Sequence, residues 1–171
     1  ELVDVYALQT QHFLECEAAS VRVCIERVEK AARAGNDDGI QSGLDKLGIV
    51  LRNWDRVAQP IQLSTKSRGI RHELSHTLAV EIRSLGIGLF NEHEKLDVAQ
   101  QVTKLLQEVF EEIPDVAERL EQDAEAIEGL FATRDRMVSE AREWERKITY
   151  RAEVGTIFKT ILSISPEGLQ W

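Results

Sequence analysis

The chain has 171 residues, of which 43% are hydrophobic and 30% are charged, as is usual for one globular domain. Its net charge of -9 argues against a nucleic-acid partner, because binding phosphates requires a basic face. No apolar run approaches the roughly 20 residues of a membrane-spanning helix, and residues 1–4 do not resemble a signal peptide. We therefore expect a soluble protein without a membrane or nucleic-acid partner.

The first two predicted helices form an antiparallel hairpin. Residues 2–34 carry a stripe with alternating spacings of four and three and one polar gap, made of Val3, Ala7, Leu14, Ala18, Val21, Ile25, Val28 and Ala32. Gly35 ends this helix, and Asn36 or Asp37 caps the next. The second helix is expected to end at Pro60, followed by an ordered loop and hinge over residues 59–69.

Cys16 and Cys24 lie eight positions apart on the first predicted helix, which places their Cα atoms roughly 12 Å apart. They cannot form a disulfide within that helix, because a disulfide requires a Cα separation of about 4.4–6.8 Å. Two unpaired cysteines without a signal peptide indicate the reducing cytoplasm. The chain begins without methionine and contains only Met137, so we expect it to be a piece of a longer protein.

Three further helices are predicted, over about residues 71–94, residues 97–112 and from Pro114 to about residue 148. Gly129 is expected to kink or split the last one. The aromatic residues that lie on or beside the apolar stripes are expected in the core; they are Trp54, Phe90, Phe131 and Trp144.

The last residues have a different character. Residues 156–164 are rich in β-branched and aromatic side chains, and residues 165–168, Ser-Pro-Glu-Gly, are typical of a turn. We therefore predict a helical domain over residues 1–154 and a β hairpin over residues 155–171. Because an isolated hairpin is only marginally stable, we expect it to begin a further β domain.

Residues 72–76, His-Glu-Leu-Ser-His, match the H-E-x-x-H signature of zinc metallopeptidases. In that signature His72 and His76 would bind zinc, and Glu73 would be the general base. A catalytic zinc also needs a third protein ligand. The variant with a third histidine is excluded, because this chain has Ile82 at the required position.

A downstream glutamate is the remaining source of a third ligand. Glu92 or Glu94 could serve, but the apolar stripe continues to them, so both are expected on the same helix, which puts Glu92 roughly 24 Å from His76. Only a break in the helix at Gly86 or Gly88 would bring Glu92 or Glu94 close to His76. We therefore interpret the motif as surface or helix-capping residues and assign no catalytic residue, metal ligand, cofactor-binding residue or cofactor.

Two resemblances extend this interpretation. Leu85-Gly86, Ala99 and Pro114 resemble positions of a degenerate tetratricopeptide-type repeat, which implies stacked helical hairpins. Residues 54–62, 83–92 and 150–171 are similar to uncharacterised bacterial proteins in which a helical region leads into a small β domain. This second resemblance implies no activity and no functional residues.

The predicted fold is all-α, an array of five to six antiparallel amphipathic helices with a short C-terminal β hairpin. We expect a non-catalytic interaction or scaffolding module that binds a protein partner in its grooves. Two alternatives remain open: a zinc-dependent hydrolase using His72, Glu73 and His76, and a self-association module in which the stripe of residues 3–32 pairs between chains.

Overall fold

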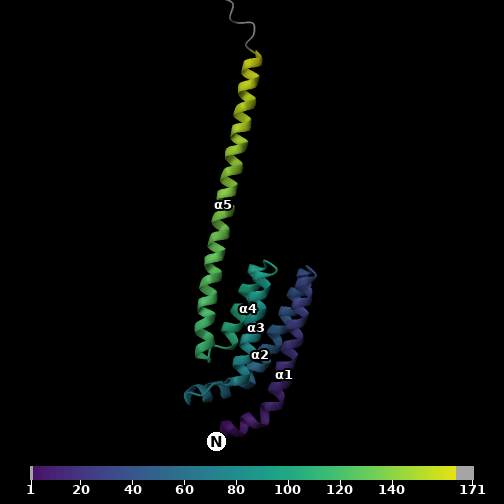
Figure 1. Cartoon of the computed structure of the whole chain (residues 1–171), viewed down its shortest axis with the longest axis vertical. Helices are drawn as coiled ribbons and strands as arrows, with labels where there is room; N and C mark the ends of the chain where they lie inside the picture. The colour runs from purple at the N-terminus through teal and green to yellow at the C-terminus, as the bar shows by residue number, and fades with distance from the viewer. Residues whose placement is uncertain (1, 165–171) are drawn as a thin grey trace, which may run out of the picture. The chain divides into compact units, whose positions relative to one another are not determined.

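The computed structural model describes residues 2–164, and in this part of the chain it contains five helices and no strand. The predicted all-α fold is therefore confirmed for these residues. The helices, shown in Figure 1, are α1 (Leu2–Arg33), α2 (Asp37–Ser67), α3 (Glu73–Asn91), α4 (Leu96–Val109) and α5 (Pro114–Ile164).

The turn between α1 and α2 has the predicted chemistry. Gly35 adopts a left-handed backbone with φ of 64°, and its N–H donates to the carbonyl of Ala32 at 3.0 Å. The Asn36 side chain caps α2 by accepting the N–H of Gly39 at 2.9 Å. The chain thereby reverses, and α1 and α2 pack along each other as an antiparallel hairpin (Figure 1).

The core lies among the first four helices and the start of α5. α1 packs on α2 and α3, and α4 packs on α3 and α2. Trp54 of α2 is fully buried beside Phe110, with 5.6 Å between the ring centroids. Val116 and Leu120 add the first two turns of α5 to the same apolar cluster.

The prediction that Pro60 ends the second helix is wrong, because α2 continues to Ser67 with Pro60 in its interior. An interior proline removes one hydrogen bond and costs about 3 kcal/mol. The next turn buries the apolar side chain of Ile61, which offsets part of this cost. Figure 1 shows the last turns of α2 at an angle to the preceding part, as expected for a proline kink. The connection between α2 and α3 is therefore shorter than predicted and consists of the residues between Ser67 and Glu73, and the hinge stays a prediction.

The β prediction also fails where it can be tested, because residues 156–164 are the last turns of α5. The helix penalty of a β-branched residue is only a few tenths of a kcal/mol, whereas extending an existing helix avoids the cost of nucleation. The predicted turn and return strand, residues 165–171, lie outside the described residues. α5 is one helix that continues through Gly129, so it is not split there as the sequence suggested. It also continues through residue 154, and the domain boundary predicted after that residue remains a prediction.

The chain divides into two compact units, residues 1–128 and residues 129–171. The first holds the four-helix core and the start of α5. Within residues 2–164, no helix is both long enough and apolar enough to cross a membrane.

Candidate functional site

The metallopeptidase-like string lies at the start of α3. His72 is the N-cap residue, Glu73 begins the helix and His76 lies within its first turn. The Nδ1 atom of His72 contacts the Oγ atom of Ser75, a fully buried hydroxyl that also accepts a hydrogen bond from Nε2 of Gln62 at 3.2 Å. One ring nitrogen of His72 is therefore engaged by a side chain of the protein interior.

His76 has a different neighbour. Its Nε2 atom lies 3.4 Å from the carboxylate of Asp115, and Arg71 binds the same carboxylate at 3.0 Å. Burial lowers the pKa of His72, although the nearby Glu73 carboxylate acts in the opposite direction. The two histidines thus occupy separate polar networks.

The prediction that the helix continues through Gly86 and Gly88 is confirmed, whereas the prediction that Glu94 lies on it is wrong, because α3 ends at Asn91 and Glu94 has a left-handed φ of 56°. α3 runs through Gly86 and Gly88 to Asn91, and the Gly86 Cα lies close enough to α4 that an added Cβ would be 3.1 Å from Val102. Glu92 is therefore roughly 24 Å from His76 along the helix. Among the residues that the structure describes, no group of three or more His, Cys, Asp or Glu side chains could hold a metal ion.

A pocket of about 260 Å³ lies beside His72, between the end of α2 and the connection from α4 to α5. Lys66 and Arg71 give it positive charge, and Glu112 and Asp115 give it negative charge. The Oε1 atom of Gln62, a residue only 2% exposed, has no hydrogen-bond partner among the described residues. A polar pocket of this size can hold ordered water.

A second polar feature lies where α2 meets α4. Burial, followed by the charges of three glutamates on or just after α4, raises the pKa of Asp55 to about 6. The largest of these three charge effects comes from Glu112, which is buried and accepts a hydrogen bond from Gln59 at 2.8 Å. The Oδ1 atom of Asp55 has no hydrogen-bond partner among the described residues, so its negative charge is poorly compensated.

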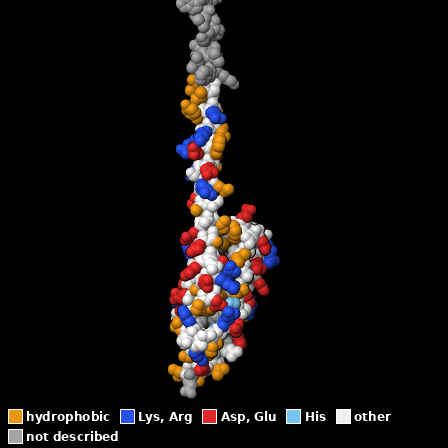
Figure 2. All heavy atoms as spheres, turned by 60° about the vertical axis from the view of Figure 1, so that its left-hand side comes forward, with side chains coloured by type: hydrophobic (Ala, Val, Ile, Leu, Met, Phe, Trp, Pro, Cys, Tyr) orange, Lys and Arg blue, Asp and Glu red, His pale blue; other side chains and the backbone are white. Residues whose placement is uncertain are grey.

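The second unit carries a row of exposed apolar side chains on α5. Its members recur at helical spacing on one side of the helix, and we call them the α5 stripe: Leu130, Met137, Ala141, Trp144 and Ile148. Trp144 and Ile148 are each 64% exposed. No side chain of residues 121–157 is buried. Figure 2 shows hydrophobic side chains exposed between basic and acidic ones along this part of α5.

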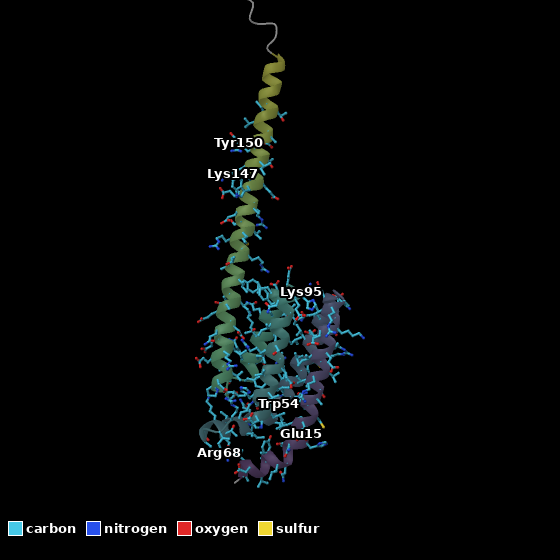
Figure 3. The ribbon with its side chains drawn as sticks, in the orientation of Figure 1. Glu15, Trp54, Arg68, Lys95, Lys147 and Tyr150 are labelled. Carbon is cyan, nitrogen blue, oxygen red and sulfur yellow. The ribbon has the colours of Figure 1, made fainter. Side chains whose placement is uncertain are left out.

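Charged groups flank the α5 stripe. Lys147 lies 5.4 Å from the centroid of the Trp144 ring and 2.8 Å from the Glu143 carboxylate. Figure 3 shows Lys147 and Tyr150 extending from α5, and Tyr150 is also exposed. Residues 129–157 carry six basic and five acidic side chains, whereas residues 108–128 carry one and nine. The segment around the stripe is therefore nearly neutral.

The expectation that all four aromatic residues lie in the core is correct for Trp54 and wrong for Trp144. Phe90 and Phe131 are only partly buried. Periodicity identifies the apolar face of a helix, but it does not say whether another part of the chain covers that face. The apolar stripe of residues 3–32, which was predicted to pair between chains, is instead largely covered within the chain. From Leu14 to Ala32 its residues are largely buried, and α1 packs on α2 within the same chain.

Comparisons with known proteins add no assignment. No family model matches the chain, no curated protein matches it, and no solved structure matches it. Two resemblances therefore remain predictions: the one to a tetratricopeptide-type repeat and the one to uncharacterised bacterial proteins. The exposed α5 stripe is the feature on which a functional proposal can be based.

Proposed function

We propose that this chain is a non-catalytic interaction module that binds a helix of another protein chain through the α5 stripe. The observation that carries the proposal is the exposure of Met137, Trp144 and Ile148 on one side of a continuous helix. Helical partners commonly recognise such a row by packing their own apolar side chains against it.

The energetics of an uncovered helix support this proposal. Most helical stability in proteins comes from packing an apolar face, and a helix exposed on all sides is otherwise marginal. Covering a large apolar side chain contributes about 1.5–3 kcal/mol. Trp144 also supplies a rigid, amphipathic surface of the kind that dominates binding energy at interfaces.

The test uses the full chain as an affinity bait and quantifies the proteins that it retains from cell extract. Trp144→Glu should abolish retention of a specific protein, because it places a charge in the apolar row. Ser139→Glu adds the same charge on the opposite face of the same helix and should retain that protein. Equal retention by both variants, each with the wild-type helix content by circular dichroism, would overturn the proposal.

The proposal assigns no catalytic role to His72, Glu73 or His76. The zinc-hydrolase alternative gains no support from the described residues, since His72 is engaged by Ser75 and His76 lies beside Asp115. The cytoplasmic location expected from sequence is also part of the proposal. Both cysteines are free thiols, and Cys16 is exposed, which suits a reducing compartment.

A further inference from the structure

We infer that the partner of the α5 stripe is a second copy of this chain, packed antiparallel along residues 130–155 of α5. This inference rests on the proposed function and makes it more specific. It depends on two properties of the segment: the sizes of the side chains that would face each other, and the signs of the charges beside them.

The α5 stripe has the spacing of a coiled-coil seam. Ala141 and Ile148 are seven residues apart, and Met137 and Trp144 form a second seven-residue series offset by four. In an antiparallel pair, members of one series face members of the other. Ala141 then lies opposite the partner's Trp144, and Met137 lies opposite the partner's Ile148.

This arrangement matches large side chains with small ones. The Trp144 ring fills the space left by the partner's Ala141, and symmetry produces the same contact twice. A parallel pair would instead place Trp144 against Trp144 and Ala141 against Ala141, which crowds one layer and leaves a void in the next. Voids and crowding each destabilise a packed core.

The flanking charges favour the same orientation. In the antiparallel pair Glu140 lies beside the partner's Lys147, and symmetry gives two attractive pairs. In the parallel pair Glu140 would lie beside the partner's Glu145, which gives two repulsive pairs. Lys147 binds Glu143 of its own chain, but both side chains are more than half exposed, and such a pair contributes only about 0.3–0.5 kcal/mol.

The ends of the seam limit its strength. Arg134 would face the partner's Arg151, so the apolar layers are confined to the span from Met137 to Ile148, roughly 17 Å of helix. The aliphatic stems of arginine can cover the end layers while their charged heads remain in water. We therefore expect a reversible dimer with a dissociation constant of about micromolar magnitude rather than a permanent one.

The test is sedimentation equilibrium of the full chain over a range from low micromolar to millimolar concentration. The wild-type chain should approach the mass of two chains, and Trp144→Glu should keep the mass of one. Glu140→Lys should raise the dissociation constant about tenfold, since it creates two repulsive pairs with the partner's Lys147. Adding Lys147→Glu to Glu140→Lys should restore dimerisation. Glu153→Lys, the same charge change on the opposite face, should leave it unchanged.

Tighter dimers in Glu140→Lys would indicate a parallel pair and overturn the antiparallel arrangement. A dimer that survives Trp144→Glu would show that another surface pairs and would overturn the inference. If the wild-type chain has the mass of one chain at every concentration, the second copy is not the partner. In that case the affinity-bait experiment decides the proposed function. The proposed function stands if wild-type bait retains another protein that Trp144→Glu does not retain, and it falls if both baits retain the same proteins.

Discussion

Arg83 of α3 binds Asp123 of α5 through two parallel hydrogen bonds, with Nε to Oδ2 at 2.6 Å and Nη2 to Oδ1 at 2.8 Å. This contact lies one turn beyond Leu120, the last buried side chain of α5 among the described residues. The hydrogen bonds to Asp123 raise the pKa of the Arg83 guanidinium, so the pair stays charged. A bidentate, partly buried ion pair is stronger than an exposed one.

Replacing Asp123 by alanine should therefore lower the free energy of unfolding by about 1–2 kcal/mol, because it leaves Arg83 without its partner. Urea denaturation measures this change, and the double variant with Arg83→Ala isolates the pair energy. The control is Glu29→Ala, which removes an exposed pair with Arg33 and should cost less than about 0.5 kcal/mol. Equal decreases in the free energy of unfolding of both variants would show that the bidentate pair contributes no more to stability than the exposed pair.

Asp55 should make stability fall as pH rises. Its pKa is about 6 in the folded chain, above its ordinary value of 3.8, so between these values the folded chain binds more protons than the unfolded chain. The stabilising effect is complete below about pH 4 and is lost as pH passes about 6. The full shift corresponds to roughly 3 kcal/mol, but Asp55 is partly exposed, so we expect about 1 kcal/mol.

Asp55→Asn removes this titration. It should stabilise the chain by about 1 kcal/mol at about pH 7 and have little effect at about pH 4, as measured by urea denaturation at both pH values. Asp45→Asn changes an exposed carboxylate of the same helix and serves as the control. A gain at about pH 7 no larger than that of the control would contradict the argument from burial.

Gly43 should not tolerate a side chain. A Cβ atom added there would lie 2.6 Å from Cγ2 of Val28, a fully buried and stiff side chain. Overpacking of this kind costs about 1–3 kcal/mol, which exceeds the gain of about 1 kcal/mol from replacing glycine by alanine in a helix. We expect Gly43→Ala to destabilise the chain by about 1 kcal/mol in thermal or urea unfolding.

Gly129→Ala provides the matched control, because a Cβ atom at that position meets nothing within 4 Å. It should raise the stability of α5 by about 0.5–1 kcal/mol, seen as higher helix content near the melting temperature. If Gly43→Ala stabilised the chain as much as Gly129→Ala, the close approach of α1 and α2 would be refuted.

The purified chain should contain no stoichiometric zinc after dialysis against micromolar zinc, because the described residues provide no third ligand beside His72 and His76. Elemental analysis measures the metal. One zinc per chain that disappears in His72→Ala, together with a hydrolytic activity lost in Glu73→Gln, would establish the metallohydrolase instead.

Several local features could be predicted because their causes are local. Gly35 and Asn36 are a helix-ending and a helix-capping residue within one turn, so the first helical hairpin follows from neighbouring residues alone. Pro60 and residues 156–164 were mispredicted because local propensity competes with burial and with cooperative extension of the helix.

Apart from the end of α2 and residues 156–164, the amino-acid sequence by itself determined which residues form helices and which side of each helix is apolar, since both depend on spacing along the chain. Only the tertiary structure decided which apolar sides are covered. Trp54 and Trp144 both lie on or beside apolar stripes, yet Trp54 is 0% exposed and Trp144 is 64% exposed. The physical reason is that burial needs a second surface: the helices of the four-helix core surround Trp54, whereas nothing in the described residues buries Trp144.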